Sequence, residues 1–253
     1  MKRLLGYALL GLLAFGLFLA LRAPATLLTD RLATQAQGFS VQDAIGTVTE
    51  GSAREVRWRG VRVAQLDWRW QVLALLSGWL EFHWQTIDPA VALNGQIAVN
   101  ASRHIRWRAV RGQLPLAQLG ALAGYPNPPL QGLVEFALEE MVCNAAGRPR
   151  SARGVITLRD ARITLGQPLH LGALSLQLTP TQPEGIQGAF KDQGGPLALE
   201  GVLKLAPDGR YQITGQIKAR DATPQALRQA LQLLGAPGAD GGWNLNFSGL
   251  LPP

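Results

Sequence analysis

The sequence predicts a mainly β protein: a curved antiparallel sheet with a groove-like form and a few short helices, preceded by one N-terminal transmembrane helix. Three observations predict it. They are an uncharged apolar run near the N-terminus, a two-residue alternation of apolar and polar residues in most of the remaining chain, and 29 glycines among 253 residues. Alternation with a period of two is typical of strands with one buried face. Glycine within strands marks bulges, bends or close backbone approach.

The apolar run covers residues 4–21 and contains no charged residue, whereas Lys2 and Arg3 precede it. Its length reaches the lower bound for a helix that spans a bilayer and exceeds the apolar core of a cleaved signal peptide. Cleavage is the alternative, but the Ala-x-Ala triplet at 23–25 has proline inside it. We therefore expect a cytoplasmic tip at 1–3, an uncleaved signal anchor at 4–21, and residues 22–253 on the periplasmic side of the inner membrane.

The charge balance favours a membrane-side location over nucleic-acid binding. The chain has 24 basic and 17 acidic residues, a net charge of +7, and three of the basic residues lie within the first 22 positions. The exported part therefore carries 21 − 17 = +4, which fits a domain beside anionic headgroups better than a nucleic-acid-binding domain. The lone Cys143 excludes an internal disulfide and is expected to be a small core residue.

Helices are expected at four places after the anchor. The segments with helical spacing or helix-boundary residues are 26–37, 72–76, 116–123 and 223–234. Gly38 would end the first helix, and the last has Thr223 as a candidate N-cap, Pro224 at its first position and Gly235 after its end. The proline-rich segment 125–129 is a candidate boundary between two halves of the exported domain.

Strands are expected wherever the alternation is strict. The clearest runs are 54–59, 61–63, 66–70, 105–108, 156–159, 174–178 and 203–205. An apolar residue, any residue and then glycine recur beside them, ending at Gly60, Gly95, Gly112, Gly132, Gly188, Gly201, Gly215 and Gly249. Asp208-Gly209 predicts a tight hairpin turn. These features together predict a sheet built from repeated hairpins.

A search for catalytic or metal-binding patterns gives none. His83, His104 and His170 do not pair at metal-ligand spacing, and no Gly-x-Ser-x-Gly sequence occurs. Residues 192–196 resemble a phosphate loop but lack its Lys-Ser/Thr ending, so a turn is expected there. We therefore expect no enzyme activity, no cofactor, no metal and no small-molecule substrate.

Arginine and tryptophan interleave on two predicted strands. The candidate contact residues for a partner or for lipid headgroups are Arg57, Arg59, Arg106 and Arg108. Such interleaving can bind single-stranded nucleic acid, but strict alternation places tryptophan on one face and arginine on the other, so nucleic acid is not expected. Two interpretations stay open: a solvated arginine face over an aromatic core, or a basic face turned toward headgroups or an acidic partner.

Several stretches occur in a characteristic order. They are 46–51, 66–68, 110–116, 194–201 (Gly-Gly-Pro-Leu-Ala-Leu-Glu-Gly, the most specific), 209–211, 231–235 and Gly241. With the N-terminal anchor and the β-rich remainder, the chain resembles protein N of the bacterial type II (general) secretion system over essentially its whole length.

The resemblance implies an accessory inner-membrane component that contacts other secretion-system components during export of folded proteins across the outer membrane. It implies no catalytic residues and no cofactor. The family is itself similar to AsmA-like envelope proteins with a β-groove, so the alternative is an envelope protein that contacts lipid through an apolar groove. Partners would then be other secretion components and inner-membrane lipid. A continuous apolar groove would favour lipid, and a packed core under a polar surface would favour protein contacts.

Overall fold

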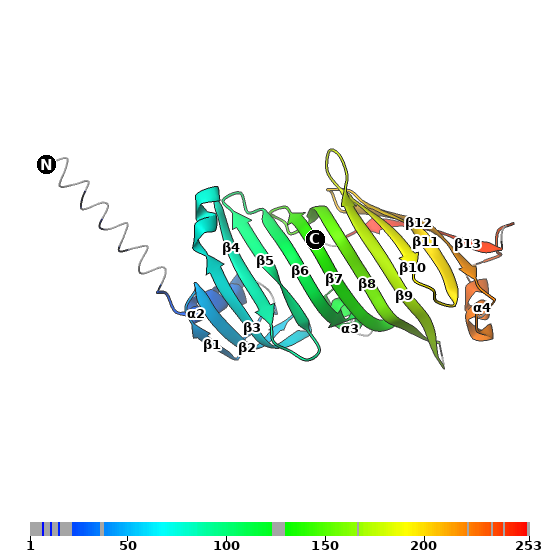
Figure 1. The fold of residues 1–253 in the computed structure, drawn as a ribbon, viewed down its shortest axis with the longest axis horizontal. Coiled ribbons are helices and arrows are strands. Elements are labelled where there is room, and N and C mark those ends of the chain that lie inside the picture. Colours follow the sequence, from blue (N-terminus) through cyan, green and yellow to red (C-terminus); the bar gives the residue numbers. More distant parts are fainter. Residues whose placement is uncertain are drawn as a thin grey trace.

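Thirteen strands form one open antiparallel sheet in which the order of the strands follows the order of the chain (Figure 1). The computed structural model describes residues 7, 11, 15, 22–35, 38–122, 130–165, 167–221, 223–233, 235–239 and 241–251. Within these residues the mainly β class, the antiparallel pairing and the few short helices are confirmed. The groove-like curvature stays a prediction.

Strands that are consecutive in the chain are also neighbours in the sheet. The strands are β1 (Asp43–Gly46), β2 (Glu50–Trp58), β3 (Val61–Gln71), β4 (Trp79–Thr86), β5 (Ala92–Asn100), β6 (Ile105–Pro115), β7 (Leu130–Cys143), β8 (Pro149–Leu165), β9 (Gln167–Pro180), β10 (Ile186–Asp192), β11 (Leu197–Leu205), β12 (Arg210–Ala219) and β13 (Gly242–Leu250). The helices are α2 (Ala25–Gln35), the 3-10 helix η1 (Val72–Ser77), α3 (Leu116–Leu122) and α4 (Gln225–Gln232). In Figure 1, α2 lies near the N-terminal end of the sheet and α4 near its C-terminal end.

The apolar residues of successive strands lie on the same face because the strand register keeps their alternation in phase. The core cluster contains one buried residue from each of five consecutive strands: Val110, Leu138, Ala152, Leu178 and Ile186. Partly buried aromatic residues extend this face toward β4, where the rings of Trp84 and Trp107 meet edge to face at 6.0 Å. Such ring pairs stabilise a core beyond the area that they bury.

Where strict alternation of apolar and polar residues fails, a β-bulge returns the apolar side chains to the core face. In β6 the register against β5 shifts by one residue, and Ala109 has φ +49°. Trp107 and Val110, three positions apart, therefore both pack in the core, whereas strict alternation would put them on opposite faces. Asp160 in β8, also at positive φ, accompanies a second shift.

A second cluster closes the N-terminal end of the sheet. Ala25 of α2 packs with Ala53, Val56 and Trp68. Trp58, which the alternation placed on the core face, is instead 43% exposed. The register with β3 runs unbroken from Val56 to Trp58, so the alternation itself continues; Trp58 is exposed because it is the last residue of β2, directly before the turn to β3.

Within the described residues a helix forms at each of the four predicted places, although the second is a 3-10 helix and the predicted start of the last is wrong. α2 ends at Gln35, and Gly38 has the left-handed conformation (φ +77°) expected near a helix end. In α4, Pro224 occupies the N-cap position and no side chain caps the helix. The Thr223 hydroxyl donates instead to the Pro196 carbonyl at 2.6 Å, because that turn lies against the start of α4.

Two expectations concern residues outside the described part. None of the helices among the described residues is both long and apolar enough to cross a bilayer. Of the anchor expected at 4–21, only residues 7, 11 and 15 are described. The candidate boundary at 125–129 also lies outside the described residues, and the strands that flank it, β6 and β7, pair with each other.

Gly112 shows why glycine recurs in this sheet. It has φ +128°, and a Cβ atom there would collide with the Ala92 carbonyl and lie 2.8 Å from the Cα of Leu93. β5 and β6 can therefore approach this closely only without a side chain at this position. The role predicted for the recurring glycines is confirmed here.

Candidate interaction surface

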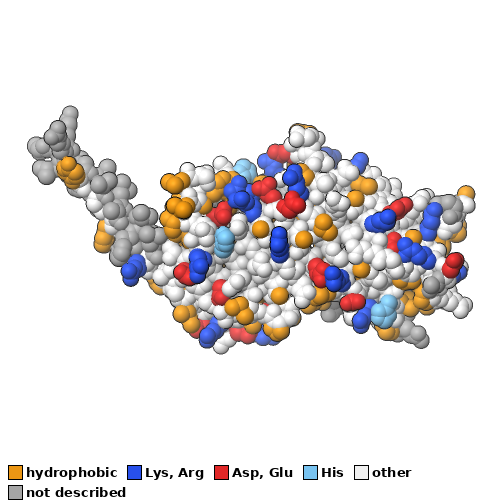
Figure 2. Space-filling model, viewed as in Figure 1, with side chains coloured by type: hydrophobic (Ala, Val, Ile, Leu, Met, Phe, Trp, Pro, Cys, Tyr) orange, Lys and Arg blue, Asp and Glu red, His pale blue; other side chains and the backbone are white. Residues whose placement is uncertain are grey.

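The polar face of the sheet carries ion pairs between neighbouring strands. Figure 2 shows basic and acidic side chains interspersed over the sheet, with hydrophobic side chains in small separate groups. Glu50 and Arg69 lie directly opposite each other on β2 and β3 and pair at 2.7 Å. Glu135 of β7 pairs with Arg159 of β8 at 2.9 Å. Exposed pairs of this kind contribute little to stability because water and salt screen them.

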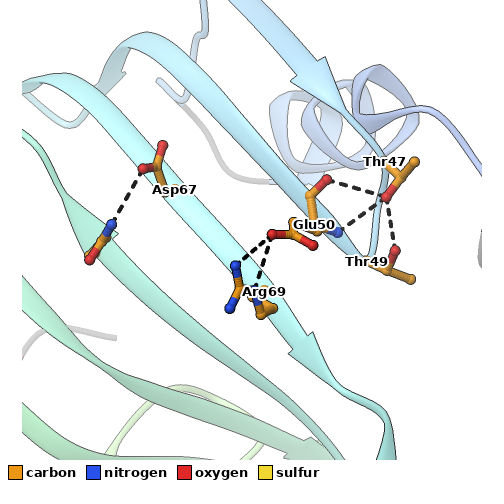
Figure 3. Close-up of polar contacts among 6 residues, drawn as sticks. Thr47, Thr49, Glu50, Asp67 and Arg69 are labelled. Carbon is orange, nitrogen blue, oxygen red and sulfur yellow. Dashed lines mark hydrogen bonds and ion pairs between the residues drawn. The ribbon is translucent and has the colours of Figure 1, made fainter.

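A depression of about 730 Å³ lies on this face across β2 to β5. Its polar lining residues are Glu50, Ser52, Gln65, Asp67, Arg69, Gln71, His83, Gln85, Asn94 and Gln96. Figure 3 shows how Glu50 and Arg69 point toward each other while Thr47 and Thr49 hold the β1–β2 turn, with their hydroxyl oxygens 2.8 Å apart. The depression therefore presents hydrogen-bonding groups from four strands.

The carboxylate of Asp67 is held in its ionised form within the depression. Burial alone would raise its pKa, but hydrogen bonds from Gln65, Ser52 and Gln85 outweigh burial and hold the pKa below its usual range. The Gln65 amide donates at 2.8 Å and the Gln85 amide at 3.4 Å. Asp67 therefore places a negative charge, already partly satisfied by its neighbours, within the depression.

The structure places the four predicted arginines in two separate pairs. Arg57 lies opposite Arg62, beside the β2–β3 turn. Arg106 and Arg108 lie opposite Ala98 and Gln96 on β5, near the end of β3 that is farthest from that turn. They therefore do not form one continuous basic surface.

Each of the four arginines already has a contact within the chain. Arg57 lies 3.8 Å from Glu55, and Arg108 lies 3.5 Å from Glu81. The guanidinium of Arg59 is 5.8 Å from the ring centroid of Trp58. These contacts reduce, without removing, the charge available to a partner.

Among the described residues, Arg106 makes the closer of two cation–π contacts. Its guanidinium carbon lies 4.1 Å from the ring centroid of Trp79. The expected separation within β6 is retained, since Trp107 packs against the core, but Arg106 contacts a tryptophan of another strand. Alternation within one strand said nothing about Trp79, which begins β4 directly after the left-handed Gly78 and reaches Arg106 across β5.

The most specific sequence stretch, 194–201, is held at the β10–β11 turn by a polar clamp of Asp192 and Arg220. The Asp192 carboxylate accepts hydrogen bonds from the N–H groups of Gly194 (3.0 Å) and Leu199 (2.9 Å) and pairs with Arg220 at 2.7 Å. The Arg220 guanidinium also donates to the Leu197 carbonyl at 3.1 Å. The turn expected at 192–196 is confirmed, and the clamp joins it to the connection between β12 and α4.

The described residues contain no group of three or more His, Cys, Asp or Glu side chains placed to hold a metal ion. Cys143 is buried, as expected for a small core residue, and burial raises the pKa of its thiol. The described surface combines hydrogen-bonding groups, ion pairs and strand edges, as protein contact surfaces do.

Comparison with known proteins decides the family. A family model described as "Type II secretion system (T2SS), protein N" matches residues 37–246. The chain belongs to this family. A type II secretion system protein N of Klebsiella pneumoniae is 30% identical over 231 residues, which cover 90% of this chain and 88% of that protein.

Other members of the protein N family align over nearly their whole lengths. The protein of Vibrio cholerae is 26% identical over 99% of this chain and 100% of its own length. That of Pectobacterium carotovorum is 28% identical over 94% of both chains. No solved structure matches this chain. The family resemblance inferred from the sequence stretches is confirmed.

The contribution of the Asp192 clamp to the free energy of unfolding should depend on pH. Burial would raise the pKa of Asp192, but the N–H groups of Leu199 and Gly194 and the Arg220 guanidinium hold it below its usual range. The unfolded value is about 3.9, so the ionised carboxylate stabilises the fold above about pH 4, and this stabilisation is lost as the pH falls through the lower, folded-state pKa.

We therefore expect Asp192→Asn to lower the free energy of unfolding at pH 7 by about 2 kcal/mol and to flatten its acid dependence. The measurement is urea unfolding of the full chain in detergent, followed by tryptophan fluorescence at several pH values. The matched control is Asp221→Asn, an exposed residue directly after Arg220. Equal losses in the two variants would contradict the clamp.

Proposed function

We propose that this chain is an accessory inner-membrane component of the type II secretion system. Residues 4–21 anchor it with residues 1–3 in the cytoplasm, and residues 22–253 form the periplasmic part. It acts by contacts with other secretion components during export of folded proteins across the outer membrane, without catalysis. The observation that carries this proposal is the family match over residues 37–246.

The contact is proposed to use the open edge of the sheet at β13. Among the described residues, β13 pairs only with β12. Its sequence, Gly-Trp-Asn-Leu-Asn-Phe-Ser-Gly-Leu, contains no charged residue and no proline. Natural edge strands are usually protected by such residues, so an unprotected edge favours pairing with a strand of a partner.

The other edge of the sheet is short, and the turn that follows it is paired. β1 has four residues, and the bridge between Pro24 and Thr47 lies beside it. The backbone of Ser40 also pairs with that of Arg57 where β1 no longer covers β2. The contrast between the two edges favours β13 as the docking strand.

Cross-linking in cells tests the β13 contact. We expect a photoreactive amino acid at the exposed Asn246 to capture a secretion component. We expect Phe247→Lys, which puts a charge at an edge position that is 54% exposed, to abolish capture while the chain still folds. Leu233→Lys, at an 88% exposed position outside β13, should leave capture unchanged. The proposal fails if no secretion component is captured and if deletion of the protein leaves exoprotein release unchanged.

The four arginines are proposed to steer the approach of acidic partners or headgroups. Replacing Arg57, Arg59, Arg106 and Arg108 by glutamine should cost each site no more than about 0.5 kcal/mol of stability. Recovery of the chain with secretion components should fall at low salt and converge with the parent at high salt, because salt screens exposed charges. Co-purification equal to the parent at every salt concentration would show that these arginines are merely solvated.

Lipid contact through the apolar face is the second candidate function. It is favoured by the single sheet: among the described residues no second sheet covers this face, and Trp84, Trp107 and Leu176 on it are only partly buried. On this alternative, organic extraction of the purified chain should release phospholipid in a fixed molar ratio. Removal of the lipid without any change in the free energy of unfolding would contradict it.

A further inference from the structure

An apolar protrusion follows β3. Residues 72–80, Val-Leu-Ala-Leu-Leu-Ser-Gly-Trp-Leu, contain no charged residue. None of the six residues of η1 is buried, and the side chains of Leu73 and Leu76 are 80% and 89% exposed. Val72, Leu75 and Leu80 are exposed as well. Single exposed leucines are common on proteins, but a contiguous group of five exposed apolar side chains marks an interaction site.

The local backbone explains why these side chains point into solvent. η1 starts directly after Gln71 at the end of β3 and stops at Gly78, whose left-handed backbone allows its N–H to bond back to Leu75. In Figure 1 this helical turn stands at the upper end of β4, beyond the body of the sheet. The turn therefore carries its leucines away from the core instead of folding them onto it.

The protrusion lies at the end of the sheet where the chain enters the described domain. The N–H of Val48 bonds to the Ala23 carbonyl at 2.8 Å, and the N–H of Trp70 bonds to the Thr49 carbonyl at 2.6 Å. Two hydrogen bonds thus join the residues after 4–21 to the β1–β2 turn, and that turn to β3 just before η1. A membrane that holds residues 4–21 lies close to this end of the sheet.

The residues beside the protrusion suit the boundary between hydrocarbon and headgroups. Trp79 follows η1, and Arg106 lies over its ring at 4.1 Å. Arg103 is exposed in the turn between β5 and β6. Trp79 pairs with Asn100, at the end of β5 that leads into this turn. Tryptophan and arginine are favoured at membrane interfaces, where the ring lies at headgroup depth and the guanidinium meets phosphate groups.

We propose that residues 72–80 insert their apolar side chains into the surface of the bilayer that holds residues 4–21, with Trp79 and Arg106 at headgroup level. The inference rests on the proposed inner-membrane anchor and adds a second, interfacial contact to it. A single anchor leaves the domain free to turn about one point, whereas two contacts fix which end of the sheet faces the membrane. The β13 edge at the other end of the sheet is then left for partner strands.

The test uses the full chain in vesicles of phosphatidylethanolamine and phosphatidylglycerol. Cys143 is replaced by alanine, and an environment-sensitive nitrobenzoxadiazole label is attached at Leu76→Cys. The matched control is the label at Leu233→Cys, which is equally exposed (88%) but follows α4 at the far end of the sheet. Circular dichroism and urea unfolding check that both variants keep the parent fold.

We expect the label at position 76 to emit at shorter wavelength than the label at position 233 and to be quenched by lipids with nitroxide on their acyl chains. Aqueous iodide should quench it at least several-fold less than the label at position 233. Equal iodide quenching at the two positions would overturn the inference. Shielding from iodide without quenching by the nitroxide lipids would also overturn it, because a protein surface would then cover the turn.

Flotation and carbonate extraction of the same vesicles test the anchor separately. If the chain floats and resists extraction while position 76 stays open to iodide, the anchor stands and the insertion of residues 72–80 is refuted. If the chain leaves the vesicles on carbonate treatment, both the anchor and the insertion fail.

Discussion

The rest of the structure depends on one constraint: thirteen sequential strands must keep their apolar side chains on the same face of a single sheet. A shift of one residue would move a strand's apolar set to the opposite face. The described chain satisfies this constraint by placing extra residues, such as Ala109 and Asp160, where strict alternation would fail. Glycines such as Gly112 then let the backbones approach where a bulge changes the pleat.

The same constraint places the polar and charged side chains on the other face. The two edge strands of the sheet differ in length. Cross-strand pairs such as Glu50–Arg69 neutralise charge locally, and the Asp192–Arg220 clamp ties a turn to the following connection. The N-terminal edge strand has only four residues, whereas β13 ends the sheet with a longer, uncharged strand. A sheet with one protected and one open edge is suited to accept a strand from a partner without polymerising through both edges.

Much of the fold could be predicted from the sequence because strands with one buried face alternate visibly. The hairpin at Asp208-Gly209 and helices α2 and α3 follow from short-range signals. The bulges, the Trp79–Arg106 stack and the bond from Thr223 to Pro196 could not be predicted, because each depends on a residue from another strand or turn. The exposure of Leu73 and Leu76 was hidden for a similar reason, since an apolar stretch indicates a helix but not what covers it.

The central claim is that β13 is the edge at which this protein meets the secretion machinery. Hydrogen exchange of the backbone amides, measured on the membrane-reconstituted chain with and without the other secretion components, tests it most directly. Outward-facing amides of β13 should exchange fast in the chain alone and become protected by at least tenfold in the assembly, with β1 unchanged. Unaltered exchange along β13, with protection gained elsewhere on the sheet, would contradict the claim.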